Sequence, residues 1–499
     1  MAMESIEADY ESLRGALPKN EYQELDNAVL GQLLRTLNPK ELRRVSGDVF
    51  GRIYEYFLTQ FADQKAHDSG EFFTPASLVS FIANVIEPTS GTVLDPACGS
   101  GGMFVQSARV VERRHENPTE KLTFYGLEKN ATTIRLAKMN LAVHGQEGDI
   151  QQAITYYEDP HDLRRKADFV MANPPFNVDE IDADKIKKDQ RLPFGLPGVN
   201  KKGKVSNGNY VWISYFYSYL NEQGRAGFVM SSQASSAGRD EAKVRQKLVE
   251  TGDVDIMVAI RSNFFYTRTV PCELWFLNRA KPEAHRDKVL MIDARNTYRK
   301  VTRKIYDFSP EQEQNLLAIA WLYRGETERY LYLVADYCHR MLAETSRNLV
   351  KQSDLLYKLA CRLIETCEND CGAKDSSAWA SRNITRARKA VDDDRTQAVQ
   401  QLKKVRYFWK QAHWLTERFP EAQLRDVEGL VKLVDRAEIE ANDWSLTPGR
   451  YVGVAPEEVD EDFDFEEALR EIHVELEDLN AEAVQLAATI KKNFEELGG

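Results

Sequence analysis

Apolar and polar positions along the chain follow three successive patterns. Up to about residue 70, apolar residues recur at helical spacing, as at Leu30, Leu33 and Leu37. From about residue 88 to 300, short apolar runs alternate with amphipathic stretches, and from about 309 to 440 helical patterns dominate again. Alternation of this kind is typical of a doubly wound, mostly parallel sheet. The chain is therefore predicted to be an α/β protein with helical N-terminal and C-terminal regions.

The short apolar runs are the predicted strands. They are Thr92–Leu94, Leu122–Leu127, Ile150–Ile154, Asp168–Met171, Ala226–Met230, Asp255–Ile260 and Leu274–Leu277. Helices are expected between several of them, notably at 208–223 and 239–250. Ligands of such sheets bind at the carboxyl ends of the strands, so the residues that follow these runs are the first candidates for a site.

A glycine-rich turn follows the first predicted strand. Its sequence is Asp95-Pro96-Ala97-Cys98-Gly99-Ser100-Gly101-Gly102, and its glycines let the backbone approach a ligand closely. The second strand ends at Glu128, about one βαβ unit later, where a carboxylate is placed to hold two ribose hydroxyls. These features would also suit a dinucleotide dehydrogenase, but the turn does not fit the pattern G-x-G-x-x-G.

The predicted strand Asp168–Met171 runs into Ala172-Asn173-Pro174-Pro175-Phe176. Two successive residues without N–H groups cannot continue a sheet, so the backbone here is rigid and bent. The Asn173 oxygen and the Pro174 carbonyl can accept the two hydrogens of a planar exocyclic amine, while Phe176 stacks on the base. This frees the nitrogen lone pair to attack without a strong general base. The alternative is a proline-rich turn with Phe176 in the core.

The stretch Gly70-Glu71-Phe72-Phe73-Thr74-Pro75 precedes an amphipathic run that begins near Leu78. It is typical of a loop that enters a helix, with Thr74 as the N-cap and Pro75 at the first helical position. The free N–H groups at such a helix start can bind an anionic group.

Composition narrows the function classes. The 499 residues suggest two to three domains, and 42% hydrophobic content describes a soluble globular chain. The longest apolar stretch, Tyr210 to Leu220, is too short to span a bilayer, and the acidic first ten residues are unlike a signal peptide. Six scattered cysteines favour a reducing cytoplasm, and we expect no metal site. With a net charge of −12, the chain either does not bind DNA or has a partner that supplies much of the contact.

Taken in order, DPACGSGG, Glu128 and NPPF resemble the amino-group methyltransferases of DNA. The upstream EFFTP, KMNLAVHG at 138–145 and GRAGFVMSS at 224–232 resemble one branch of them, the modification (methylase) subunits of type I restriction-modification systems. This match covers roughly residues 45–300, and Asp443-Trp444-Ser445-Leu446-Thr447-Pro448-Gly449-Arg450-Tyr451 resembles the tail of that family.

The resemblance implies a methyltransferase fold, S-adenosyl-L-methionine as methyl donor, adenine in DNA as target, and a separate specificity subunit that is typically joined by two methylase subunits. A restriction subunit stays open as a further partner. The resemblance assigns the cofactor to Glu71, Phe72, Phe73, Thr74, Pro75, Ala76, Asp95, Ala97, Gly99, Ser100, Gly101, Gly102 and Glu128. It assigns the target base to Asn173, Pro174, Pro175 and Phe176. The polar residue that the family has after its third strand is not evident around Ala153-Ile154-Thr155.

A long charged loop follows NPPF, from about 177 to 210. Its basic residues are Lys185, Lys187, Lys188, Arg191, Lys201, Lys202 and Lys204. Next to a base pocket, these residues favour contact with DNA phosphates. The alternative is a solvated loop, because four acidic residues share its first part.

We divide the chain into a helical N-terminal region (1–70), a methyltransferase domain (71–305), a helical region of unknown role (306–455), and an acidic linker with a terminal helix (456–499). The basic run between Arg382 and Arg406 can lie on DNA or form a solvated helix face. Apolar residues from Leu469 to Ile490 recur with coiled-coil spacing, which favours a helix of a partner subunit over packing within the chain.

Four functions fit to different degrees. The favoured one is a DNA adenine methyltransferase subunit whose partner reads the sequence. A self-sufficient methylase would use residues 310–440 for recognition. A methylase of protein glutamine or RNA is disfavoured by the basic loop and EFFTP, and a non-catalytic scaffold by the intact Asp95, Glu128 and Asn173.

Overall fold

The computed structural model describes residues 2–19, 26–37, 57, 74–265, 271–301, 305–345, 350–370 and 381–454, together with residues 473, 477 and 484. The chain divides into two units, Met1–Val454 and Ala455–Gly499, and the elements below belong to the first. Residues Glu71 to Phe73 lie outside the described residues, as does the predicted terminal helix from Leu469 to Ile490 apart from residues 473, 477 and 484.

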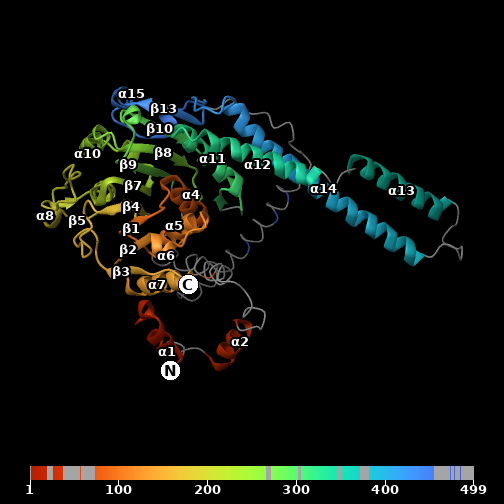
Figure 1. Cartoon of the computed structure of the whole chain (residues 1–499), viewed down its shortest axis with the longest axis horizontal. Coiled ribbons are helices and arrows are strands. Elements are labelled where there is room, and N and C mark those ends of the chain that lie inside the picture. The colour runs from red at the N-terminus through yellow and green to blue at the C-terminus, as the bar shows by residue number, and fades with distance from the viewer. Residues whose placement is uncertain are drawn as a thin grey trace. The chain divides into compact units, whose positions relative to one another are not determined.

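A nine-stranded sheet forms the centre of this unit (Figure 1). Its strands are β1 (Gly91–Asp95), β2 (Leu122–Glu128), β3 (Gly148–Gln152), β4 (Ala167–Ala172), β7 (Leu220–Ser231), β8 (Val254–Ile260), β9 (Cys272–Asn278), β10 (Lys288–Asp293) and β13 (Val431–Asp435). They are ordered β13-β10-β8-β9-β7-β4-β1-β2-β3, and only β9 and β13 run antiparallel to their neighbours. This confirms the doubly wound, mostly parallel sheet expected from the sequence.

Both faces of the sheet are buried, which explains why its strands are nearly continuous apolar runs. Val93, Met171 and Val258 point into one core, while their neighbours Leu94 and Val170 point into the other. Strand periodicity thus divides each strand between two cores.

Helices cover both faces of the sheet. The α-helices among the described residues are α1 (Ala2–Asp9), α2 (Asn27–Leu37), α4 (Ala76–Ile86), α5 (Gly102–Glu112), α6 (Pro118–Lys121), α7 (Ala131–Val143), α8 (Ala183–Ile186), α9 (Asn209–Tyr219), α10 (Arg239–Glu250), α11 (Pro310–Tyr323), α12 (Thr327–Thr345), α13 (Val350–Asp370), α14 (Ser381–Arg418) and α15 (Arg436–Ala441). Residues of α4, α5 and α11 belong to one core, and those of α9 and α10 to the other. The long helix α14 packs along α12 and α13 (Figure 1).

Helix α11 joins the helical region to the sheet. It begins with a capping box in which Ser309 and Gln312 bond reciprocally. One turn later the buried Glu313 accepts hydrogen bonds from Ser80 and Asn84 of α4, both at 2.7 Å. These bonds connect the C-terminal helices to the helix that carries Thr74 at its N-terminal side.

The C-terminal part of the helical region contains a strand that the sequence patterns did not predict. Strand β13 pairs antiparallel with β10 across more than 130 intervening residues and adds an edge to the sheet. The segment after α15 is held by Arg245, whose side chain is 2% exposed and donates to the carbonyls of Trp444 (2.6 Å) and Ala237 (2.7 Å). Residues 424–454 are therefore part of the same compact unit as the sheet.

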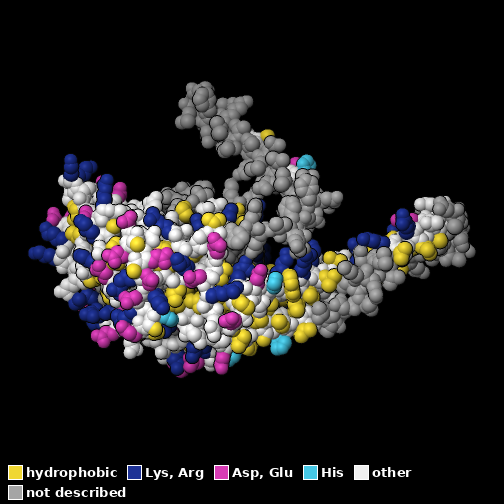
Figure 2. Space-filling model, turned by 90° about the horizontal axis from the view of Figure 1, so that it is seen from above, with side chains coloured by type: hydrophobic (Ala, Val, Ile, Leu, Met, Phe, Trp, Pro, Cys, Tyr) yellow, Lys and Arg dark blue, Asp and Glu magenta, His cyan; other side chains and the backbone are white. Residues whose placement is uncertain are grey.

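The described surface mixes both signs of charge. On the face seen in Figure 2, Lys and Arg side chains are interspersed with Asp and Glu side chains. Among the described helices, none combines the length and the apolar character that crossing a membrane requires.

Candidate active site

The candidate residues converge because their strands are neighbours. Strand β1 lies between β2 and β4, all three parallel, so their carboxyl ends share one edge of the sheet. Asp95 ends β1, Glu128 ends β2 and Asn173 directly follows β4. Chain order reverses between β1 and β4, which is where ligands of open α/β sheets bind.

The glycine turn leaves room for a ligand. Gly99 and Gly101 have φ angles of 51° and 79°, a region that favours glycine. A Cβ atom placed on Gly99 or Gly102 would meet nothing within 4 Å, so the backbone there is open to close approach. Asn140 of α7 holds the turn in place, because its side chain donates to the Ser100 carbonyl at 2.9 Å.

A second support comes from the segment after β3. The buried hydroxyl of Thr155 donates to the Pro96 carbonyl at 2.6 Å and holds the start of the turn. The family resemblance implies a ligand-binding polar residue near Thr155, whereas the Thr155 side chain has a supporting contact in the structure.

Two carboxylates flank the turn in different environments. Asp95 is 1% exposed, and burial, with the nearby charge of Glu128, raises the pKa of its carboxyl to about 8, although it accepts a hydrogen bond from Ala97 N–H at 3.0 Å. Glu128 accepts one from Asn130 N–H at 2.9 Å, and Asn130 in turn caps α7. A cationic ligand would favour the ionised form of Asp95.

A cavity of about 640 Å³ opens beside Glu128, lined by Lys129, Asn130, Gln152, Ala153, Ile154 and Glu158. Its wall is built by the ends of β2 and β3. The Glu158 carboxylate faces backbone here, because its Oε2 accepts from Ile154 N–H at 2.7 Å. A carboxylate acceptor thus lines the cavity six residues after β3, at a position that the sequence motifs did not single out.

The two ends of the Asn173 side-chain amide differ in their hydrogen bonding. Its Nδ2 donates to Thr74 Oγ1 at 2.8 Å. Its Oδ1 is buried and has no hydrogen-bond partner in the described part of the chain. Buried polar atoms are normally paired, so this acceptor can take a hydrogen bond from a ligand donor.

The rest of the motif forms a wall. Pro174 is buried, Pro175 is exposed and Phe176 is half-buried. The Phe176 ring meets Phe265 edge to face, with centroids 6.3 Å apart. Phe265 lies beyond β8 in the chain, and no sequence signal connected it to Phe176.

A cluster of asparagines holds the loop after the motif. Asn177, with φ 53°, donates its backbone N–H to the side chain of Asn209 at 2.9 Å and accepts from Asn209 Nδ2 at 2.9 Å. Asn207 donates to the same Asn177 oxygen at 3.1 Å. The start of α9 therefore fixes the direction of the chain as it leaves NPPF.

The predicted N-cap is wrong. Helix α4 starts at Ala76 with Pro75 at the cap position and no side-chain cap bond. Thr74 is drawn instead to Asn173, a long-range partner that local rules do not reveal.

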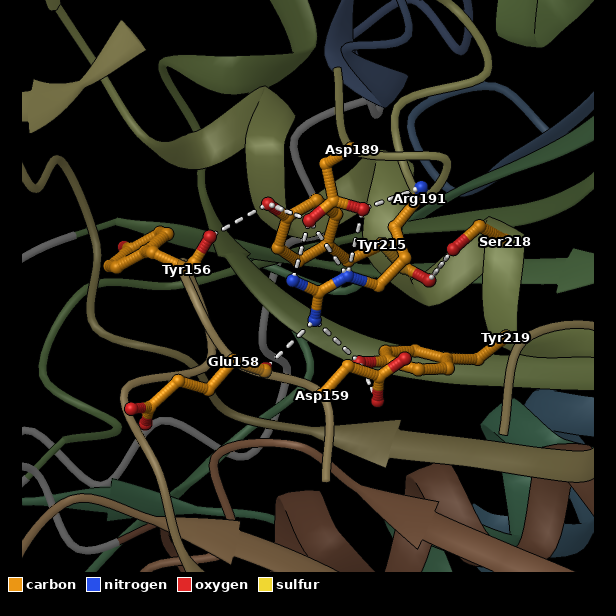
Figure 3. A network of polar contacts seen from close by, with 8 residues as sticks. All are labelled: Tyr156, Glu158, Asp159, Asp189, Arg191, Tyr215, Ser218 and Tyr219. Carbon is orange, nitrogen blue, oxygen red and sulfur yellow. Dashed lines mark hydrogen bonds and ion pairs between the residues drawn. The ribbon is translucent and has the colours of Figure 1, made fainter. Parts of the chain in front are cut away.

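The charged loop also differs from the expectation of free phosphate ligands (Figure 3). Arg191 is 3% exposed, forms a bidentate ion pair with Asp189 (Nη2 to Oδ2, 2.7 Å) and donates to the Tyr219 hydroxyl at 2.8 Å. Burial opposes ionisation of Asp189, but the hydrogen bonds from Arg191 outweigh it and lower its pKa. Arg191 is thus a structural residue.

Two lysines of the loop also pair within it, Lys187 with Asp184 and Lys204 with Asp182. Contact of the remaining lysines with phosphates stays a prediction. No group of three or more His, Cys, Asp or Glu residues that could hold a metal ion occurs within the described ranges.

Comparison with known proteins identifies the family of the chain. The family model described as N-6 DNA Methylase matches residues 45–343. The chain belongs to the N-6 DNA methylase family. A relative, the methylase subunit of the type I restriction enzyme MjaIX from Methanocaldococcus jannaschii, is 32% identical over all of this chain and 72% of its own length.

Two further comparisons extend this result. The HindI methylase subunit from Haemophilus influenzae is 28% identical over all of this chain and 91% of the relative. The crystal structure of a type I restriction-modification methyltransferase subunit from Streptococcus thermophilus has the same fold, with a TM-score of 0.54 at 20% identity, covering 83% of this chain and 66% of the other.

Membership of the N-6 DNA methylase family confirms the resemblance seen in the motifs. The chain is an adenine-specific DNA methyltransferase of the type I methylase-subunit kind. The residues that perform the reaction are inferred from the geometry below.

Proposed function

We propose that this chain binds S-adenosyl-L-methionine at the edge formed by β1, β2 and β4, and that Asn173 presents the amino group of an extruded adenine to it. The observation that carries this proposal is the buried, unpartnered Oδ1 of Asn173. An amide oxygen accepts hydrogen bonds only, and the amino group of adenine has two hydrogens to donate.

The cofactor supplies an electrophilic methyl group. Asn173 Oδ1 and the Pro174 carbonyl each accept one hydrogen of the amine, which localises the nitrogen lone pair. Phe176 and Phe265 form two walls at right angles, against which a flipped base can pack. The proton leaves after the nitrogen has become cationic, so no general base is required in the described site.

The opposite end of the site suits a nucleoside. Glu128 is placed for the ribose hydroxyls, and the cavity beside it for the adenine of the cofactor. Glu158 would accept from the adenine amino group, and Ile154 N–H, now bonded to Glu158, would donate to a ring nitrogen. The open backbone at Gly99 and Gly102, with Thr74, Pro75 and Ala76, would surround the methionine end.

DNA recognition is assigned to a partner. Contacts with DNA phosphates carry no sequence information. In addition, a chain with a net charge of −12 gains little electrostatic free energy when it binds DNA. The two relatives above are named as subunits of type I restriction enzymes, which supports a specificity subunit as that partner.

The test is methyl transfer by the purified chain, alone and with its specificity subunit, to duplex DNA with labelled cofactor. We expect transfer to adenine N6 at defined sites by the complex and little transfer by the chain alone. Transfer at one sequence by the isolated chain would favour a self-sufficient enzyme that reads DNA through residues 310–440.

A further inference from the structure

A single hydrogen bond joins two motifs that lie 99 residues apart. Asn173, after β4, donates from Nδ2 to Oγ1 of Thr74, which stands before the first turn of α4. Helix α4 is firmly packed, with Leu78 and Ile82 completely buried. Thr74 therefore lies two residues before the first residue of a firmly packed helix.

The helix itself does not use this oxygen. An N-cap threonine normally accepts from an N–H group of the first turn, but α4 has no side-chain cap bond and begins after a proline. The Thr74 hydroxyl is therefore available to the amide of Asn173. A hydroxyl that capped the helix would already be bonded to a backbone N–H group.

The orientation of that amide decides whether it can assist the reaction. A half-turn about the last side-chain bond exchanges the donor Nδ2 and the acceptor Oδ1. With Oδ1 toward the substrate, the amide accepts a hydrogen of the amine. With Nδ2 in that place, the N–H groups of the amide would face those of the amine, and no hydrogen bond could form. The structure has the productive orientation, with Nδ2 on Thr74 and Oδ1 unpartnered among the described residues.

We infer that Thr74 is a positioning residue for methyl transfer, whose hydroxyl holds the Nδ2 end of Asn173 and so directs Oδ1 at the target amine. This rests on the proposed role of Asn173. It assigns the Thr74 hydroxyl to Asn173 instead of the cofactor contact that the family resemblance implies, and the two assignments have different kinetic consequences.

The experiment compares Thr74→Val, which keeps the shape and removes the hydroxyl, with Thr74→Ser, which keeps the hydroxyl. Thr92→Val, at the opposite end of β1 from the site, is the matched control. For each variant, in complex with the specificity subunit, we measure kcat at saturating cofactor and DNA, the cofactor Kd by calorimetry, and the melting temperature.

Loss of one orienting hydrogen bond predicts that Thr74→Val lowers kcat about 5- to 10-fold while the cofactor Kd stays within about twofold. Thr74→Ser retains at least about half of the turnover, and Thr92→Val matches wild type. Should Thr74→Val not fold, Thr74→Cys, of similar volume and with a weak acceptor, replaces it with the same expectation.

Three results would overturn the inference: wild-type kcat in Thr74→Val, a loss that disappears when cofactor is saturating, or a serine variant as impaired as the valine variant. A wild-type complex that transfers no methyl group to adenine would contradict the proposed function itself. Normal turnover of Thr74→Val in an active complex contradicts only the role of Thr74.

Discussion

The Glu158 carboxylate accepts a hydrogen bond from the backbone N–H of Ile154 at 2.7 Å, and both residues line the cavity. We propose that Glu158 is the polar group after the third strand that the sequence motifs did not show, and a substitution can test this role.

Glu158→Gln keeps the shape of the side chain but puts a donor where a charged acceptor was. We expect cofactor affinity to fall by about 1–2 kcal/mol, because a hydrogen bond to a charged acceptor is lost, with kcat at saturating cofactor nearly unchanged. Calorimetry measures the affinity, and the exposed Glu147→Gln, at the opposite, amino-terminal end of β3 and outside the cavity lining, is the control. Equal cofactor affinity in both variants would remove Glu158 from the cofactor site.

Cofactor binding should depend on pH through Asp95. Burial raises the pKa of Asp95 to about 8, so the folded chain holds this proton at neutral pH and loses stability as pH rises toward that value. A cation binds better to the carboxylate, so the affinity for the cofactor should rise about tenfold between pH 7 and pH 9.

Asp95→Asn separates this effect from titration of the α-amino group of the cofactor. The variant should lose the rise that is due to Asp95 and bind more weakly at the alkaline end. Calorimetry across the pH range measures both, and parallel pH profiles for wild type and variant would contradict a role for Asp95.

Arg191 should be required for stability. Arg191→Met removes the buried cation from Asp189 and the Tyr219 hydroxyl, which keep only their contacts with neutral groups and with Asp159, and this should cost about 2–3 kcal/mol of unfolding free energy. Urea unfolding followed by tryptophan fluorescence measures the loss. Lys187→Met, which breaks an exposed ion pair in the same loop, is the control and should leave stability nearly unchanged. A phosphate-binding role would instead weaken DNA binding without unfolding.

The C-terminal segment should serve assembly. Removing residues 465–499 is expected to abolish complex formation with the specificity subunit and site-specific methylation, while cofactor binding stays intact, because coiled-coil spacing suits a partner helix. Co-purification measures assembly. A truncated chain that still joins its partner and methylates the same site would assign the segment to internal packing.

A longer truncation provides the contrast. Removing residues 443–499 also takes away two of the carbonyls that Arg245 binds, those of Asp443 and Trp444, and the buried Leu446 and Tyr451. This should unfold the methyltransferase unit and abolish cofactor binding, as followed by melting temperature.

The sequence predicted what is local. Buried parallel strands are continuous apolar runs, so the strand ends at Asp95, Glu128 and Asn173 followed from periodicity, and the rule that strand ends share an edge brought them together. What the sequence did not show depends on contacts between distant segments. Strand β13 was not predicted because it takes its place only through pairing with β10.

Side-chain partners were predicted less well for the same reason. From the sequence alone, Thr74 is expected to be an N-cap and Arg191 a surface cation. In the structure, Thr74 accepts a hydrogen bond from Asn173, and Arg191 donates one to Tyr219. Local propensity cannot anticipate these bonds, because the competing partner approaches only in the folded chain.

The central claim is that Asn173 acts on the nucleophile and not on the cofactor. Asn173→Ala should lower kcat for methyl transfer about 100-fold or more, as does loss of one preorganised polar group in a reacting site. The most direct measurement is single-turnover transfer of labelled methyl groups to a specific duplex, with the cofactor Kd determined on the same protein. The account predicts near-complete loss of transfer with an unchanged Kd; retained turnover, or a loss explained by weaker cofactor binding, would contradict it.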